Sequence, residues 1–243
     1  MIPKVIHYCW FGGKPLPESA LRCIASWRRF FPDYEIREWN EGNFEVNSIP
    51  YTAQAYAAGK YAFVSDYARF KILYEHGGIY FDTDVEVIKP FDDILARGAF
   101  MGCELAAPEG GVAPGLGLGA APGLGLYKEL LDRYKVLEFV REDGNLNLTT
   151  IVTYTTDLLV EHGLKPSNEI QSVAGINIYP KEYFCPLDNN TGKLDITQST
   201  HSIHWYSKTW VDIPVWRIKV SRLAHRWLGY SLSGKMRRLL RIK

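Results

Sequence analysis

The alternation of strand-like and helix-like segments at the start of the chain most constrains the fold. Residues 4–11 are mainly β-branched and aromatic and run into Gly12-Gly13, which predicts a buried strand followed by a turn. Residues 19–31 carry apolar side chains at helical spacing, and Pro32-Asp33 predicts the end of that helix. Residues 34–39 predict a second strand. Strand–helix–strand is the unit of a parallel sheet, so we expect an α/β fold.

A pair of carboxylates follows a short apolar segment in the first third of the chain. Residues 79–81, Ile-Tyr-Phe, predict a buried strand that runs directly into Asp82-Thr83-Asp84. Open α/β sheets bind ligands at strand ends, and two carboxylates there suit Mn²⁺ or Mg²⁺. An isolated Asp-x-Asp is commonly a solvated turn. The apolar strand before it favours a metal site, because a buried strand that delivers two carboxylates to an edge needs a cation.

A second charged pair precedes this motif on a predicted helix, residues 64–76, which Gly77-Gly78 should end. Asp66 and Arg69 are three residues apart, so both lie on one face of the helix. They are either a structural ion pair or part of a donor pocket. In such a pocket the guanidinium would hold phosphate or sugar hydroxyls and the aspartate would accept hydrogen bonds from the sugar.

The remaining elements are predicted from the same patterns. Helices are expected at residues 51–59, 127–139 and 149–162, and strands at 176–180 and 201–205. Residues 110–125 are rich in glycine but lack the spacing of a phosphate-binding loop. We interpret them as a flexible loop and a tight strand near the site, in preference to a phosphate cradle.

Length and charge divide the chain into a body and a tail. The 243 residues suit one large domain. Nine of the 28 Lys and Arg residues follow residue 212 with no acidic residue among them, so residues 1–212 carry 19 basic against 27 acidic groups, a net charge of −8. Residues 213–243 are therefore expected to form a basic amphipathic segment. It either lies on an anionic membrane surface or packs on the domain as a helix. Nucleic acid is not an expected partner, because the body is acidic.

Targeting signals and cysteines suggest a compartment. We expect no secretory signal and no membrane span, and the four scattered cysteines are expected to be reduced. The predicted location is therefore the cytoplasm, at the inner face of the bacterial plasma membrane if the tail binds lipid.

Residues 61–87 together resemble the signature of the DXD-containing glycosyltransferase family. This family includes yeast initiating mannosyltransferases, animal α-1,4-galactosyltransferases and bacterial capsular-polysaccharide transferases. The opening residues 2–13 resemble the family's first strand. The spacing also resembles that of the more distant clostridial glucosylating toxins: an aspartate, an arginine three later, a tyrosine eleven after that, then two aspartates. The positions are Asp66, Arg69, Tyr80, Asp82 and Asp84.

The resemblance implies a GT-A fold, that of the nucleotide-diphospho-sugar transferases, with a Rossmann-like, mainly parallel sheet flanked by helices in residues 1–212. It also implies roles for single residues. Trp10 matches the aromatic residue that stacks on the donor base. Asp66 and Arg69 match contacts with the donor sugar and phosphate, and Tyr80 matches a contact near the ribose. Asp82 matches a residue shared between donor and metal.

The family's metal site extends to the C-terminal part of the chain. Asp84 matches the direct metal ligand, and His204 a further ligand, although a packed strand histidine is the alternative. Thr209 and Trp210 match residues that approach the diphosphate leaving group. The chain departs from the family pattern twice, because Trp205 replaces a second histidine and Thr209 replaces a serine. Thr209 keeps a hydroxyl.

The expected function is a retaining, Mn²⁺- or Mg²⁺-dependent transfer of a hexose or N-acetylhexosamine, with Asp82, Asp84 and Arg69 stabilising the leaving group. The donor is expected to be a UDP-sugar, and the acceptor a saccharide, lipid-linked, in bacterial surface polysaccharide synthesis. Mannosyl transfer from GDP-mannose and a catalytically silent sugar-nucleotide-binding scaffold are the alternatives. A metal-dependent phosphohydrolase is a further rival, which would need no Trp10.

Overall fold

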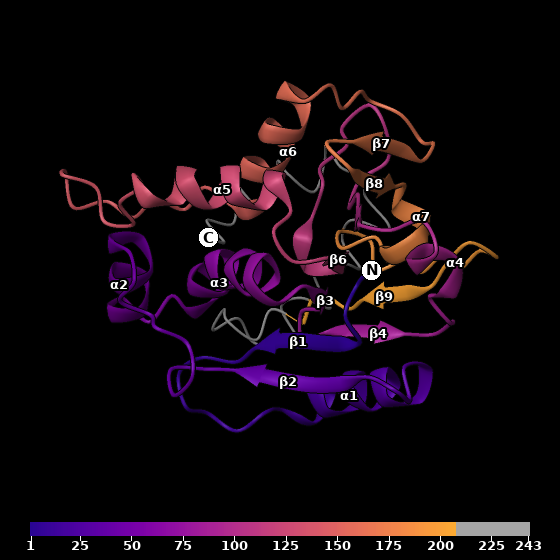
Figure 1. The fold of residues 1–243 in the computed structure, drawn as a ribbon, viewed down its shortest axis with the longest axis horizontal. Coiled ribbons are helices and arrows are strands. Elements are labelled where there is room, and N and C mark those ends of the chain that lie inside the picture. The colour runs from indigo at the N-terminus through magenta and orange to yellow at the C-terminus, as the bar shows by residue number, and fades with distance from the viewer. Residues whose placement is uncertain (208–243) are drawn as a thin grey trace, which may run out of the picture.

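The computed structural model describes residues 1–207. Within this part a seven-stranded sheet forms the centre, and helices cover both of its faces (Figure 1). The strands of this sheet are β1 (Val5–Cys9), β2 (Glu35–Trp39), β3 (Gly78–Tyr80), β5 (Phe100–Gly102), β6 (Leu118–Ala120), β7 (Gln171–Val173) and β8 (Ile176–Tyr179). Their order is β2-β1-β3-β6-β5-β8-β7.

Most strands of the sheet point the same way. β1 pairs in parallel with β2 and β3, and β5 pairs in parallel with β8. β6 is antiparallel to both β3 and β5, so β3 and β5 run in one direction, and β7 is antiparallel to β8. The carboxyl ends of β1, β3 and β5 therefore meet at one edge of the sheet, which is where such sheets bind ligands.

The helices of the described part are α1 (Glu18–Phe30), α2 (Pro50–Ala57), α3 (Tyr61–His76), α4 (Asp92–Leu95), α5 (Gly125–Lys135), α6 (Ile151–Glu161) and α7 (Lys181–Phe184), with a 3₁₀ turn at Pro114–Leu116. One core cluster joins α2, α3, α5 and α6 to one face of the sheet, and a second joins α1, α4 and α7 to the other. Side chains alternate between the two clusters along each strand, as the pleat requires. In β1, for example, Tyr8 enters one cluster and Cys9 the other.

A second, two-stranded sheet pairs β4 (Val85–Val87) with β9 (Ser202–His204) in antiparallel register. Helix α1 holds it in place, because the Trp27 Nε1 donates a hydrogen bond to the Val85 carbonyl over 2.8 Å. The Val87 amide likewise donates to the Ser26 hydroxyl over 2.9 Å. Since β4 follows Asp84 directly, this small sheet brings the end of the described chain beside the acidic motif.

The opening strand–helix–strand unit and all seven later predicted helices and strands that fall in residues 1–207 are present, with shifted ends. Helix α5 ends at Lys135 and not at the predicted residue 139. The Phe139 amide donates instead to the Gln54 side chain over 2.8 Å, which ties this segment to α2. Five short elements were not predicted by residue range: α4, β4, β5, β7 and α7. The basic tail, Thr209 and Trp210 lie outside the described residues.

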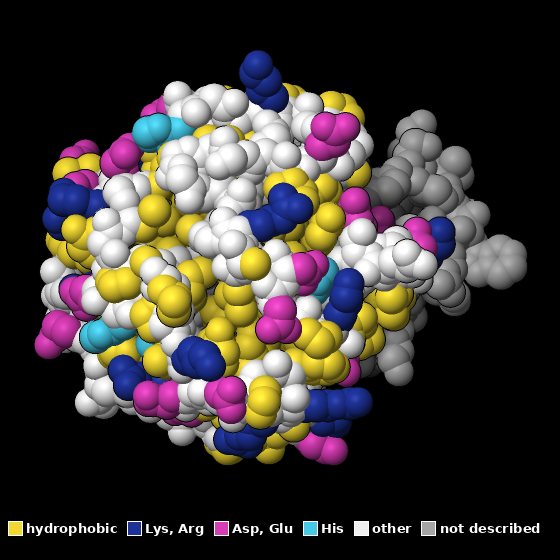
Figure 2. Space-filling view, turned by 45° about the vertical axis from the view of Figure 1, so that its right-hand side comes forward, with side chains coloured by type: hydrophobic (Ala, Val, Ile, Leu, Met, Phe, Trp, Pro, Cys, Tyr) yellow, Lys and Arg dark blue, Asp and Glu magenta, His cyan; other side chains and the backbone are white. Residues whose placement is uncertain are grey.

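Charged groups of both signs are mixed on one face of the molecule. On the face drawn in Figure 2, acidic and basic side chains are interspersed with apolar ones, and neither sign gathers in one broad patch. No helix within residues 1–207 combines the length and apolar character needed to cross a bilayer.

Candidate active site

A cavity of about 620 Å³ lies at the carboxyl ends of the parallel strands. The structure brings most of the predicted site residues to its wall: Trp10, Asp66, Arg69, Asp82, Asp84 and His204. Tyr80 lies directly behind them, fully buried. Because these residues lie in α3 and β9 or shortly after β1 and β3, only the tertiary fold brings them together.

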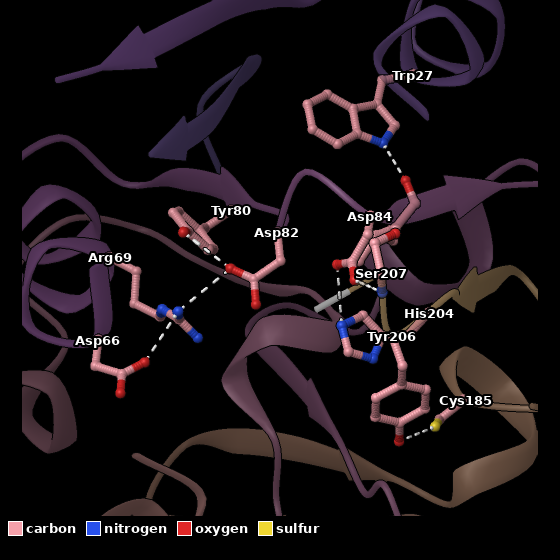
Figure 3. A network of polar contacts seen from close by, with 11 residues as sticks. Trp27, Asp66, Arg69, Tyr80, Asp82, Asp84, Cys185, His204, Tyr206 and Ser207 are labelled. Atoms are coloured by element: carbon pink, nitrogen blue, oxygen red, sulfur yellow. Dashed lines mark hydrogen bonds and ion pairs between the residues drawn. The ribbon is translucent and has the colours of Figure 1, made fainter. Parts of the chain in front are cut away.

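A buried ion-pair network joins the helix α3 pair to the acidic motif (Figure 3). The Arg69 Nη2 lies 3.1 Å from the Asp66 Oδ1 and 3.2 Å from the Asp82 Oδ1. The Tyr80 hydroxyl donates to the same Asp82 oxygen over 3.0 Å. Arg69 also packs over the Tyr80 ring, with 5.0 Å from its Cζ to the ring centroid. Arg69 thus holds the two carboxylates in fixed positions on the cavity wall.

Burial sets the protonation of this network. Burial raises the pKa of Asp66 to about 7, against the lowering effect of Arg69. Burial also raises the pKa of Asp82, again opposed by Arg69. Burial alone would lower the pKa of Arg69, but Asp82, Tyr80 and Asp66 outweigh it and the pKa is raised. The guanidinium is therefore the fixed positive charge of the site.

Asp84 and His204 form the second half of the site. The His204 Nε2 lies 3.1 Å from the Asp84 Oδ1, and the Ser207 amide donates to the Asp84 Oδ2 over 2.7 Å. The β4–β9 pairing sets Val85 opposite His204, which explains this proximity. Burial would raise the pKa of Asp84, but His204 and the Ser207 amide outweigh it and lower the pKa. Burial would lower the pKa of His204, but Asp84 raises it.

The ligand atoms of Asp82, Asp84 and His204 fit a divalent cation. One such atom from each residue lies within 4.8 Å of the others. Two carboxylates and an imidazole are a donor set that Mn²⁺ accepts. The Nδ1 of His204 is buried and has no hydrogen-bond partner among the described residues. The residues present therefore suit a metal site. For His204 this favours the role of a metal ligand over that of a packed strand histidine.

Tyr206 holds the His204 ring in place. Its ring packs edge-on against the imidazole at a centroid distance of 4.3 Å, and its hydroxyl lies 3.0 Å from the Cys185 Sγ (Figure 3). Trp205, one of the two departures from the family pattern, instead donates its Nε1 to Glu86 over 2.8 Å. It is absent from the cavity wall formed by residues 1–207.

The glycine-rich segment supports the site from behind. It contains the 3₁₀ turn and β6, which agrees with the predicted tight strand. Gly115 is pressed against the acidic motif, since a Cβ built on it would lie 2.1 Å from the Asp82 Oδ2 and 3.4 Å from the Arg69 Nη1. Only glycine permits this approach.

Replacing Gly115 with alanine should therefore displace the Asp82 carboxylate. We expect turnover of the donor to fall by about 100-fold, because displacements of about 1 Å near reacting groups cost this much. Gly125→Ala is the matched control, since nothing lies within 4 Å of its added methyl group. Steady-state rates and thermal melting of both variants test this expectation. Equal activity of the two variants would contradict it.

The sequence did not predict every residue of the cavity wall. Glu104, Tyr206, Asn189 and Thr150 also line it. Glu104 follows β5 by two residues, so the strand-end rule that singled out Asp82 would have pointed to it, had β5 been predicted. No sequence signal marks Tyr206, because its contacts with His204 and Cys185 depend on tertiary structure.

Comparison with known proteins agrees with this geometry. Residues 17–101 match the model of a family described as glycosyltransferase sugar-binding region containing DXD motif. This segment includes Asp66, Arg69 and the Asp82-Thr83-Asp84 motif. The resemblance that the sequence carries is thereby confirmed.

Two curated relatives align with part of the chain. Inositol phosphoceramide mannosyltransferase 1 of Schizosaccharomyces pombe is 30% identical over 116 residues, covering 41% of this chain and 33% of the relative. An uncharacterized glycosyltransferase of Acanthamoeba polyphaga mimivirus is 36% identical over 110 residues, covering 41% of this chain and 42% of the relative. The chain thus spans less than half the length of the curated relatives that it matches.

The fold also matches a solved structure. The structure titled PaToxG glycosyltransferase aligns with a TM-score of 0.52 and 21% identity, covering 66% of this chain and 69% of that chain. This likeness confirms the expected fold class, an α/β protein of the GT-A type.

Proposed function

We propose that this chain is a metal-dependent glycosyltransferase that moves a sugar from a nucleotide-sugar donor to a saccharide acceptor. The main observation behind the proposal is that the Asp66–Arg69–Asp82 network and the Asp84–His204 pair line the same cavity. Such a row of fixed charges suits a donor whose diphosphate lies at the acidic motif and whose sugar lies over Asp66. The family match of residues 17–101 supports the same class of reaction.

The wall residues divide the work of the reaction. Trp10 directly follows β1 and is proposed to offer an aromatic face to the donor base. Arg69 stabilises negative charge on the departing nucleotide diphosphate. Asp82, Asp84 and His204 hold a divalent cation, Mn²⁺ or Mg²⁺, which when bound supplies further positive charge to that leaving group. Thr209 and Trp210 are proposed to complete the diphosphate contacts.

The stereochemical proposal is retention of the anomeric configuration. Asp66 and Asp82 are both paired with Arg69, and Asp84 is paired with His204. We therefore assign these three carboxylates to binding the donor or the metal, and not to covalent attack on the sugar. We favour attack of the acceptor hydroxyl on the anomeric carbon of the donor sugar, from the same face that the diphosphate leaves. The leaving phosphate accepts the hydroxyl proton.

The donor is proposed to be a UDP-sugar that carries a hexose or N-acetylhexosamine, and the product a bacterial surface polysaccharide. The proposed place of action is the cytoplasmic face of the plasma membrane, reached through the basic segment 213–243. Mannosyl transfer from GDP-mannose is the second candidate, and the name of the Schizosaccharomyces pombe relative favours it.

Release of nucleotide diphosphate from a panel of UDP- and GDP-sugars with Mn²⁺ tests the proposal. We expect turnover of one donor, and loss of that turnover when a chelator removes the metal. Donor binding without turnover, with or without saccharide acceptors, would favour the scaffold alternative. Hydrolysis of simple phosphate esters would favour a phosphohydrolase.

A further inference from the structure

Glu104 occupies a position on the cavity wall opposite to Trp10. In the sheet, β1 lies on one side of β3, and β6 followed by β5 lies on the other. Trp10 directly follows β1, Asp82 follows β3, and Glu104 follows β5. β1, β3 and β5 are parallel, so the acidic motif lies between the Trp10 end and the Glu104 end of the cavity.

The backbone fixes Glu104 firmly in this position. Its amide donates to the Gly111 carbonyl over 2.9 Å, and the Ala113 amide donates to the Gly102 carbonyl over 2.9 Å. Cys103 and Val112 form an antiparallel bridge between these two bonds. Glu104 is therefore presented from a short hairpin, with backbone hydrogen bonds on both sides of its stem.

The carboxylate of Glu104 differs from the other carboxylates of the wall. Asp66 and Asp82 are paired with Arg69, and Asp84 is paired with His204. No hydrogen bond or ion pair engages the Glu104 side chain within the part of the chain that the structure describes. The side chain is half-buried, and burial raises its pKa. Both carboxylate oxygens are therefore left to accept hydrogen bonds from a ligand that enters the cavity.

The strand order places Glu104 on the side of the acidic motif that is farther from Trp10. His204 and Lys181 are the charged groups that act on its carboxylate, and both lower its pKa. If the base lies at Trp10 and the diphosphate at the acidic motif, Glu104 faces the part of the cavity that the donor leaves free.

We propose that Glu104 binds the acceptor, with its carboxylate accepting hydrogen bonds from hydroxyl groups of a neutral sugar beside the metal site. This inference rests on the proposed transferase function and names the acceptor side of the same cavity. A negatively charged sugar is disfavoured there, because its carboxylate or phosphate would face Glu104 as a like charge. The acceptor-binding end thus selects neutral saccharide termini over acidic ones.

Two variants separate the hydrogen bond from the charge. Glu104→Ala should lower transfer to p-nitrophenyl β-D-glucoside, galactoside or mannoside by about 10- to 100-fold, the usual effect of losing a hydrogen bond to a charged group. Glu104→Gln keeps an acceptor oxygen and removes the charge. The ratio of the transfer rate to p-nitrophenyl β-D-glucoside over that to p-nitrophenyl β-D-glucuronide should therefore be smaller for Glu104→Gln than for the wild type. Glu109→Ala, an exposed site in the same hairpin, should leave both properties unchanged.

Calorimetric titration of the nucleotide-sugar donor with Mn²⁺ completes the test. We expect wild type, Glu104→Ala and Glu104→Gln to bind the donor with the same affinity. The inference is overturned if Glu104→Ala weakens donor binding as much as transfer, if transfer is unchanged, or if a donor-binding wild type uses none of the neutral glycosides. Failure of the wild type to bind any donor would instead overturn the proposed function, and the acceptor role with it.

Discussion

Replacing Asp84 with asparagine is expected to lower turnover of the nucleotide-sugar donor by about 1,000-fold, because the change removes a metal ligand and its charge. Asparagine keeps an oxygen that can accept the Ser207 amide, now 2.7 Å from the Asp84 Oδ2. The fold should therefore survive. Initial rates of nucleotide diphosphate release at saturating Mn²⁺ give the measurement.

Asp157→Asn is the control for the Asp84 variant. Asp157 is exposed on α6 and does not line the cavity. The Asp157→Asn variant makes the same chemical change outside the site, so it should turn over the donor at the wild-type rate. Turnover of Asp84→Asn within tenfold of the wild-type value would mean that Asp84 does not hold the catalytic metal.

Replacing Arg69 with methionine is expected to abolish turnover and to destabilise the protein by about 3–5 kcal/mol, the usual cost of removing one partner from a buried charge pair. Only 4% of the Arg69 side chain is exposed, and it neutralises both Asp66 and Asp82. For a protein of this size the loss corresponds to a melting temperature lower by roughly 10 °C or more. Thermal melting at several pH values gives the measurement.

The pH dependence of this loss has a definite sign. Burial already raises the pKa of Asp66 to about 7 with Arg69 present, and Arg69 acts to lower it. Without Arg69, the pKa of Asp66 in the folded protein rises further above its pKa in the unfolded chain. The resulting loss of unfolding free energy is complete above the folded-state pKa and becomes smaller as the pH falls through that pKa. The stability deficit of Arg69→Met should therefore be larger at pH 8 than at pH 5.

Two further variants sharpen the Arg69 experiment. Asp66→Asn combined with Arg69→Met removes one of the two unpaired charges, and should recover part of the stability at pH 8 without recovering turnover. Arg133→Met breaks the Arg133–Glu161 pair on the surface and should cost less than about 1 kcal/mol. If Arg69→Met and the wild type had the same melting temperature at pH 8, Arg69 would not be the charge that stabilises the Asp66 and Asp82 carboxylates.

Periodicity was sufficient to predict the part of the fold that positions the acidic motif. The alternation over β1, α1 and β2 and the apolar residues of β3 are local patterns, so the β1 and β3 ends could be placed from sequence. Strand β5 is only three residues long and follows the four-residue helix α4. Elements of this length carry no period, and only their pairing in the sheet defines them.

The candidate site shows the same division. Asp66 and Arg69 could be paired from helical spacing, and the structure brings them together at 3.1 Å. His204 was placed beside Asp84 only by the family resemblance, because the β4–β9 pairing that joins them is non-local. Glu104 was missed because β5 was missed, although it follows its strand end as Asp82 follows β3.

Calorimetric titration of UDP- and GDP-sugars into the wild-type protein, with and without Mn²⁺, measures whether this cavity binds a nucleotide sugar together with a metal. We expect at least one nucleotide sugar to bind in the presence of the metal. We also expect this binding to be lost on chelation and to be weakened about tenfold or more by Trp10→Ala, because the base would lose its stacking partner. Absence of metal-dependent binding of any nucleotide sugar would contradict the assignment of this cavity as a donor site.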